Sequence, residues 1–178
     1  ISYIDKGYKV ITLTASCGLM LKFEWPLLLP NDEDIKKLSK NTFDIDEYIV
    51  DISNKEGLAK GMQEIDGGVT VHHACHARAQ NMGNKARDML KLIPNVKIDL
   101  VERCAGHGGT FGVMKQTYDT AVKVAKNTVS SVKRKNNKYM ASDCPLAGKH
   151  IKQLEEDTNI NNDEALHPIE LVAKSYRL

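Results

Sequence analysis

The chain has 178 residues, enough for one hydrophobic core or for a complete domain and part of another. Its apolar fraction of 42% and charged fraction of 27% exclude disordered and collagen-like classes. The formal net charge of +2 does not favour general nucleic-acid binding. The longest apolar run, Trp25–Pro30, is too short to span a bilayer.

The N-terminus has neither the basic start nor the apolar stretch of a signal peptide. The chain begins with isoleucine, so we expect a fragment or a processed product. Four cysteines without a secretory signal predict a cytoplasmic, reducing compartment, where clustered cysteines more often bind metal than form disulfides.

The first part of the chain contains three predicted elements before a glycine-containing linker over residues 56–68. They are a buried strand over 8–15, a helix within 18–25 that Pro26 and Pro30 end, and a helix over 33–41 that Asn31 and Asp32 cap and that continues with mixed spacing over 43–52.

The second part alternates strands and helices. The predicted elements are a strand over 68–73, a helix carrying Met82 to Ile93 that Pro94 stops, a strand over 96–101, a long helix over 112–135, a strand over 139–142, a helix starting at Pro145 and a last helix over 165–177. This alternation predicts an α/β fold with a parallel sheet, whose ligands gather at the carboxyl ends of the strands. Cysteines follow these ends.

A short internal repeat links the two parts. Residues 15–22 (ASCGLMLK) parallel residues 142–149 (SDCPLAGK), each with C-x-L-x-x-K after a predicted strand, although chance remains an alternative. We expect residues 1–65 to be the end of a preceding cysteine-rich repeat plus a linker. Residues 66–178 would then form one complete cysteine-rich domain with a C-terminal helix.

Cys75, Cys104 and Cys144 follow three different predicted strands, so we expect them to converge. Thiolates from separate segments suit a soft metal or an iron–sulfur cluster. Their spacing is neither the C-x-x-C of a zinc ribbon nor that of a bacterial ferredoxin. The alternative is three buried structural cysteines.

Histidines accompany these cysteines. His72, His73 and His76 flank Cys75, and strand alternation predicts that His73 and Cys75 share a face. His76 and His107 are the better candidates for ligands or supporting groups because each lies in a corner beside a cysteine.

The loop from Cys104 to Gly112 is rich in glycine, which lets backbone N–H groups approach a phosphate or the sulfides of a cluster. It matches neither a Walker loop nor a dinucleotide-binding motif, and the alternative is a tight turn before a helix. Basic residues from Lys115 to Lys138 form either a solvated face or a docking surface for an acidic partner or membrane headgroups.

Three motifs carry a family resemblance: H-x-x-C-H over 72–76, ERCAGHGGTFG over 102–112, and SDCP over 142–145. Together they resemble the cysteine-rich CCG domain of the B subunit of heterodisulfide reductase, the C subunit of anaerobic glycerol-3-phosphate dehydrogenase and related iron–sulfur oxidoreductases. The resemblance covers roughly 66–155, and TASCGL over 14–19 resembles the end of a preceding copy.

In that family each copy supplies a leading cysteine, a Cys-Cys-Gly pair and a C-x-x-C that bind an iron–sulfur cluster. The resemblance assigns these positions to Cys75, to Cys104 after Arg103, and to Cys144, whose partner position is Ala147 or Ala141. Three cysteines suit a [4Fe-4S] cluster with one other or open corner, but not a site that needs five. His107 or His76 would fill that corner, the backbone at Gly106 and Gly108 would tune the potential, and Cys17 would be the ligand left from the preceding copy.

The resemblance implies an electron-transfer subunit that relays electrons between a partner, such as a flavoprotein dehydrogenase or a ferredoxin-like protein, and an acceptor such as a quinone. It would be cytoplasmic or peripheral at the inner face of the membrane, without a nucleic-acid partner. The alternatives are a non-catalytic zinc-binding module and a cluster-free remnant. No Ser-His-Asp or paired-carboxylate arrangement identifies catalytic residues.

Overall fold

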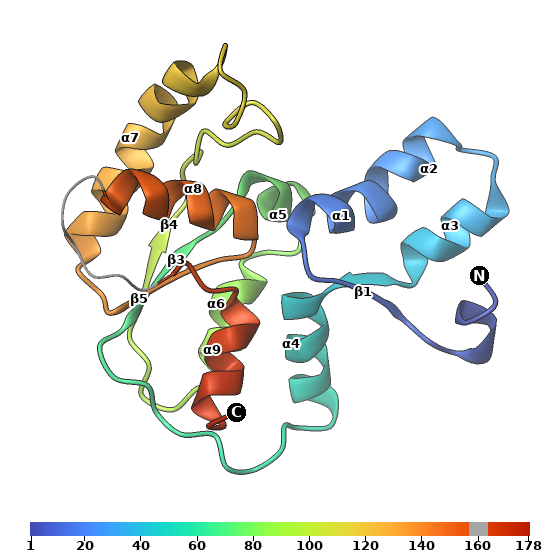
Figure 1. Cartoon of the computed structure of the whole chain (residues 1–178). Coiled ribbons are helices and arrows are strands. Elements are labelled where there is room, and N and C mark those ends of the chain that lie inside the picture. Colours follow the sequence, from blue (N-terminus) through green and yellow to red (C-terminus); the bar gives the residue numbers. More distant parts are fainter. Residues whose placement is uncertain (157–163) are drawn as a thin grey trace.

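The structure is a computed structural model that describes residues 1–156 and 164–178. Its main sheet has three parallel strands in the order β4 (Ile98–Val101), β3 (Val69–His72) and β5 (Tyr139–Ser142). A second parallel sheet pairs β1 (Val10–Thr12) with β2 (Thr42–Asp44). The predicted α/β fold with parallel strands is therefore confirmed (Figure 1).

Helices connect the strands and account for most of the regular structure. They are η1 (Ile4–Lys6), α1 (Ala15–Leu19), the π-helix η2 (Met20–Glu24), α2 (Trp25–Leu28), α3 (Glu33–Lys40), α4 (Ile45–Lys55), α5 (Cys75–Ala79), α6 (Lys85–Leu90), α7 (Tyr118–Lys135), α8 (Pro145–Glu156) and α9 (Pro168–Ser175). Within the described residues, no helix combines the length and the apolar character needed to cross a bilayer.

The main sheet lies between two helical layers. Each residue of the inner strand β3 is buried, as expected for a parallel strand covered on both faces, whereas only Val101 is buried on the edge strand β4. One face packs against α6 and α9, and the other packs against α7 and α8 (Figure 1). The core side chains are Val69, Val71, Met89, Leu90 and Leu171 on the first face, and Val101, Ala125, Val129, Met140 and Ile151 on the second.

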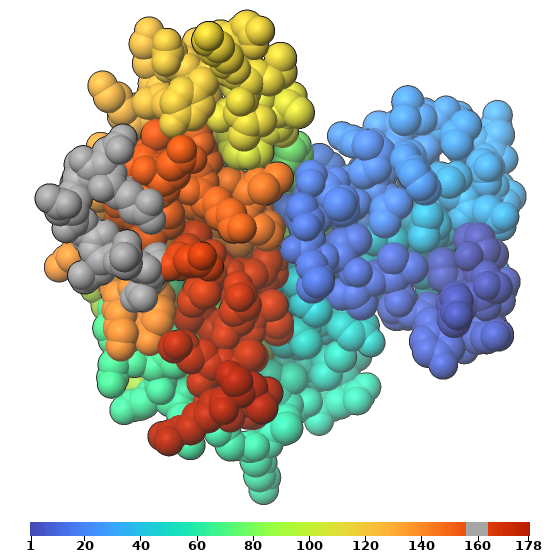
Figure 2. Space-filling model, in the orientation of Figure 1, coloured from blue at the N-terminus to red at the C-terminus, as the bar shows by residue number. Residues whose placement is uncertain are grey.

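The first part of the chain forms a lobe that stands out from the rest (Figure 2). It is joined to the main sheet by α4, which packs on α6 and α9, and by α1, which packs on α5. The Gln80 side chain strengthens this junction by donating a hydrogen bond of 3.0 Å to the Ala15 carbonyl.

Two predictions for this lobe are wrong. Pro26 does not end the helix, because the π-helix leads into α2 and places the proline in its first turn, where no intrahelical amide bond is required. The stretch 43–52 is not helical throughout, because Thr42–Asp44 pairs with β1 as β2. Asp44 then caps α4 in a capping box with Glu47.

Helix boundaries in the second part also differ from those predicted. The helix expected from Met82 to Ile93 is shorter and consists of α6 alone, because Gly83 adopts positive φ just before it. The separate short helix α5 precedes it, before the positive φ of Asn81. The long helix begins at Tyr118 instead of Gly112, because the preceding residues form successive turns. The last helix begins at Pro168, after Leu166 pairs with Ala141 in a parallel bridge.

The two short-repeat segments have similar surroundings. Cys17 and Cys144 each lie in a helix or at its start after a parallel strand. Each of those strands pairs with a later segment, β2 or Leu166, that leads into a helix with a capping box. The two boxes are formed by Asp44 with Glu47 and by His167 with Glu170. The interpretation of residues 1–65 as the end of a preceding repeat stays a prediction, to which this likeness adds structural support.

Candidate metal centre

Three cysteines follow the carboxyl ends of three neighbouring strands. Cys75 begins α5 after β3, Cys104 lies in the loop after β4, and Cys144 lies between β5 and α8. The register aligns His72 of β3 with Val101 of β4 and Ser142 of β5, so the three strands end level with one another. The parallel sheet therefore brings the three thiols to one edge.

At this edge a cavity of about 50 Å³ is lined by all three cysteines and by two of the predicted imidazoles. Its lining residues are His72, Ala74, Cys75, His76, Cys104, Ala105, His107, Gly108, Gly109, Cys144 and Ala147. Cys75 and Cys104 are exposed and Cys144 is half-buried, which contradicts the alternative of three buried structural cysteines. Cys17 is exposed on α1 and is not part of this lining.

The chemistry of these donors fits an iron–sulfur cluster or a zinc ion, since thiolates and neutral imidazoles are ligands of both. Within residues 1–156 and 164–178, no three His, Cys, Asp or Glu side chains are already arranged to hold a single metal ion. The donors thus surround a shared space without meeting at one point.

A buried histidine connects the three strand ends. His72 Nε2 donates to the Arg103 carbonyl at 2.9 Å, which leaves Nδ1 to accept from the Ser142 hydroxyl at 3.0 Å. Ser142 Oγ in turn accepts from the Cys144 amide at 3.2 Å. Burial lowers the pKa of His72 to about 4, so the ring is neutral at pH 7 and this tautomer is maintained. The network holds the Cys104 and Cys144 loops against β3.

A second buried contact joins the Cys75 and Cys144 segments. Asp143 accepts a hydrogen bond of 2.8 Å from the Ala74 amide, and burial raises the pKa of this carboxyl to about 7. His73 Nδ1 lies 3.7 Å from the other Asp143 oxygen, and burial lowers the pKa of His73. The prediction that His73 and Cys75 share a strand face is wrong, because β3 ends at His72 and Cys75 begins a helix.

The glycine loop brings a backbone donor to one of the thiols. The Gly106 amide donates to Cys104 Sγ at 3.4 Å. Gly106 has a φ of 73°, and a Cβ added there would overlap the Ala121 carbonyl oxygen, so this backbone position admits only glycine. The predicted approach of backbone N–H groups to the site is thus present at Gly106, while Gly108 lines the cavity.

Cys144 has a more buried environment than the other two cysteines. Burial raises the pKa of its thiol, and the neighbouring Asp143 and Cys75 charges act in the same direction. Hydrogen bonds from the Ala147 and Leu146 amides, in the first turn of α8, act in the opposite direction. These amides are therefore placed to stabilise a thiolate once a cation offsets the cost of burial.

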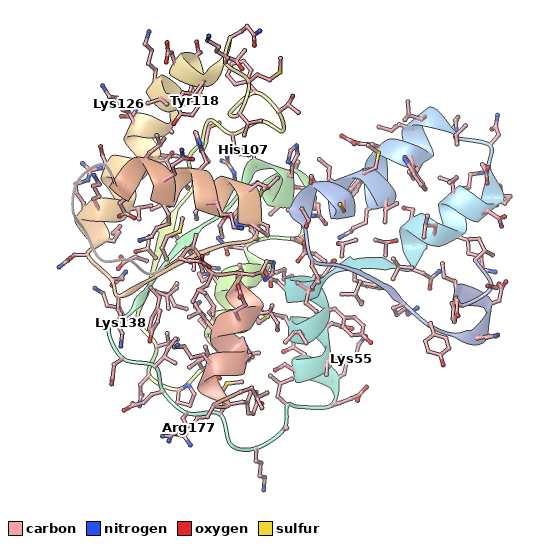
Figure 3. The ribbon with its side chains drawn as sticks, viewed as in Figure 1. Lys55, His107, Tyr118, Lys126, Lys138 and Arg177 are labelled. Atoms are coloured by element: carbon pink, nitrogen blue, oxygen red, sulfur yellow. The ribbon has the colours of Figure 1, made fainter. Side chains whose placement is uncertain are left out.

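His150 adds a residue that the cysteine motifs do not identify. It lies on α8 with 4% of its surface exposed, and its ring is 5.9 Å from the His107 ring and 6.3 Å from the Tyr118 ring. Figure 3 shows His107 and Tyr118 on the same side of the molecule. Burial, followed by the nearby His107, lowers the pKa of His150. Its Nε2 has no hydrogen-bond partner within the described residues, so a polar group remains available behind His107.

Comparison with known proteins agrees with this geometry. Residues 69–152 match the family model of the CCG cysteine-rich domain. The B subunit of fumarate reductase (CoM/CoB) from Methanothermobacter marburgensis is 26% identical over 96% of this chain and 33% of its own length. Lactate utilization protein A of a Geobacillus species is 30% identical over 76% of this chain and 58% of its own length. The C subunit of the anaerobic glycerol-3-phosphate dehydrogenase of Escherichia coli K12 is 22% identical over 96% of this chain and 41% of its own length.

This chain therefore spans between one-third and just over half of the length of these relatives. The family model covers all three strands of the main sheet and all three cysteines of the cavity. The glycerol-3-phosphate dehydrogenase component named by the sequence resemblance is among the relatives. Residues 69–152 of this chain match the CCG cysteine-rich domain family.

Proposed function

We propose that this chain is part of an electron-transfer subunit of an oxidoreductase and that Cys75, Cys104 and Cys144 bind an iron–sulfur cluster, of the [4Fe-4S] type. The observation that carries the proposal is the single cavity lined by all three thiols, which come from three adjacent strands of a CCG domain. Two of the relatives are by name subunits of a reductase and of a dehydrogenase, which supports the class of reaction.

The chain's own residues would prepare the site in defined ways. The three cysteines would bind as thiolates, and His107 or His76 would occupy the remaining position. The Gly106 amide would donate to the Cys104 sulfur and so stabilise its negative charge. When bound, such a cluster accepts and returns single electrons. The proposed partners are a flavoprotein dehydrogenase or a ferredoxin-like protein.

An exposed apolar segment supports the acceptor side of the proposal. Leu27 and Leu28 of α2 are 79% and 72% exposed, and Trp25 and Leu29 add to the same segment. We propose that a peripheral contact with the inner membrane face, and hence with a quinone, is made by this segment. Flotation with anionic liposomes tests this contact: the wild-type chain should float, Leu28→Glu should not, and equal flotation of both would contradict it.

The test of the main proposal is the iron and acid-labile sulfide content of the anaerobically purified chain, together with its visible spectrum. The proposal predicts iron and sulfide in matching amounts, and a visible absorbance that dithionite bleaches. Cys104→Ser should lose both while keeping its far-ultraviolet circular dichroism. Zinc at one ion per chain without sulfide would support the zinc-binding module instead. A metal-free chain with readily labelled thiols would support the cluster-free remnant.

A further inference from the structure

A groove of about 520 Å³ runs beside the end of β4 and is not used by the proposed metal centre. One wall is the strand and the residues directly after it, and the other is the last turns of α7. The lining residues are Leu100, Val101, Glu102, Arg103, Ser131, Arg134 and Lys135. The groove therefore combines a sheet edge with the basic end of a helix.

The β4 edge has unused backbone hydrogen-bonding groups. The Val69 amide donates to the Lys97 carbonyl, and the His73 amide donates to the Val101 carbonyl. These carbonyls, at alternate positions along β4, therefore face β3. In a parallel ladder the alternate residues, Ile98 and Leu100, point their N–H and C=O groups the other way. No hydrogen bond to these outward groups occurs within the part of the chain that the structure describes. An open edge of this kind accepts a further strand.

The opposite edge of the sheet is different. There, Leu166 pairs with Ala141 outside β5, with hydrogen bonds from the Ser142 amide to the Leu166 carbonyl and from the Leu166 amide to the Met140 carbonyl. The chain thus covers one edge of its main sheet with its own backbone and leaves the β4 edge open in the described residues.

The groove has an excess of positive charge. Arg103, Arg134 and Lys135 line it, against the single carboxylate of Glu102. Lys135 pairs with Asp99 at 3.1 Å. The Arg134 guanidinium donates to the Ser131 hydroxyl at 3.3 Å and makes no ion pair among the residues that the structure describes. The Arg103 guanidinium is exposed and makes no ion pair within residues 1–156 and 164–178. Two arginines are therefore free to bind carboxylates bidentately.

We propose that this groove binds an extended, acidic segment of a partner polypeptide, which adds to β4 as a fourth strand. The backbone of Ile98 and Leu100 would supply the strand pairing, and Arg103 and Arg134 would select acidic side chains. A second copy of this chain is disfavoured, because joining two such edges brings the same arginines together. Since Arg103 precedes Cys104, the bound segment would lie next to the loop of the metal centre.

Amide exchange measured by NMR on the full chain tests the strand pairing. The probe is a short capped peptide that alternates glutamate with valine, and the control peptide has lysine in place of glutamate. We expect the glutamate peptide to slow exchange of the Ile98 and Leu100 amides at least about tenfold. The Asp99 and Val101 amides already face β3 and should change little. Unchanged exchange at Ile98 and Leu100 with saturating peptide would overturn the proposal.

Fluorescence anisotropy of the labelled peptide tests the charge selection. The double variant Arg103→Glu/Arg134→Glu should weaken binding about tenfold or more, since each reversal replaces an attractive pair with a repulsive one. Lys123→Glu/Lys126→Glu is the matched control, because it reverses two exposed α7 cations that lie outside the groove (Figure 3 labels Lys126). Equal losses in both variants would reduce the effect to net charge and overturn the proposal.

Two further outcomes are decisive. Full competition by free glutamate would show that the groove binds a small anion and not a strand. A dimer in light scattering that the glutamate peptide converts to monomer would replace the partner with a second copy of this chain. These measurements need no bound metal, so their failure is distinguishable from failure of the proposed electron-transfer role.

Discussion

Cys17 and Cys144 follow the same local pattern, yet only Cys144 lies in a cavity with other thiols. The strands that precede the two cysteines, β1 and β5, differ in their neighbouring strands. β5 has β3 and then β4 as neighbours, and the loops after these strands supply Cys75 and Cys104. β1 has only β2, which is followed by a helix without a cysteine. The comparison shows that a strand–cysteine–helix corner becomes a metal-site candidate only when neighbouring strands deliver further donors.

The corners also differ in the residue that connects the strands. Ser142 accepts from the Cys144 amide and donates to His72, whereas the corresponding residue before Cys17 is Ala15, which has no hydroxyl. The Cys144 corner is thus fixed to its neighbours by side-chain hydrogen bonds. The Ala15 carbonyl is instead bound by Gln80, which follows α5.

The largest expected effect comes from a change in the loop after β4, which carries Cys104 and lines the same cavity as Cys144. Gly106→Ala places a methyl group on the Ala121 carbonyl at a φ of 73°, so we expect a loss of about 3 kcal/mol or more in the free energy of unfolding. Gly109→Ala is the control, since its φ is 64° but open space surrounds it, and it should cost about 1 kcal/mol. Urea denaturation measures both. Equal costs would show that the close approach to α7 is unimportant.

A smaller effect is expected when the Cys144 corner is made to resemble the Cys17 corner, which has alanine in place of Ser142. Ser142→Ala removes the hydroxyl and leaves His72 Nδ1 and the Cys144 amide without their partner, so we expect about 2 kcal/mol of destabilisation. Metal affinity should fall about tenfold because a group that orients the ligand loop is lost. Thermal denaturation and metal titration provide the two readouts. If metal affinity does not change, the hydrogen-bond network serves stability alone.

The boundary between the two regions should respond to pH. Asp46 of α4 is fully buried, and neither of its carboxylate oxygens has a hydrogen-bond partner within the described part of the chain. Burial, followed by the Asp44 and Asp143 charges, raises the pKa of Asp46 well above its ordinary value. A raised pKa means that the native state holds a proton that the unfolded state releases. This contribution to stability is therefore present at low pH and is lost as pH rises above about 4.

Asp46→Asn removes this titration. Its stability relative to the wild-type chain should increase as pH rises from about 4 to 7, reaching on the order of 2 kcal/mol. The lowered pKa values of His72 and His73 make stability rise with pH in the wild type and in Asp46→Asn alike. The difference in stability between the wild type and the variant therefore isolates the contribution of Asp46. Urea denaturation across this pH range is the measurement. A difference that stays constant with pH would show that Asp46 does not titrate there.

The smallest expected effects test the likeness between the two regions. Glu47 and Glu170 close the capping boxes of α4 and α9. Replacing Glu170 with alanine should cost about 1 kcal/mol through the lost cap. Glu47→Ala should cost somewhat more, because Glu47 also pairs with Lys22 at 2.7 Å. Thermal denaturation resolves the difference. A larger cost at Glu170 would contradict this ranking.

The sequence predicts the convergence of the three cysteines because it depends on strand order and on the rule that parallel strands end at one edge. It does not predict the role of His72, because hydrogen bonds to Arg103 and Ser142 depend on strand register. β2 escapes prediction because three residues become a strand only by pairing with β1. The start of α7 is missed because the residues before Tyr118 form successive turns, with hydrogen bonds such as Val113 amide to Thr110 carbonyl, although the apolar periodicity continues into them.

The most direct test of the difference between the two corners is the iron content of Cys144→Ser and Cys17→Ser, purified anaerobically beside the wild-type chain. Both variants should keep the helical circular dichroism of the parent. We predict that Cys17→Ser retains the iron and sulfide of the wild-type chain and that Cys144→Ser loses them. Equal loss in both variants, or equal retention, would contradict a metal centre built from the three strand ends of the main sheet.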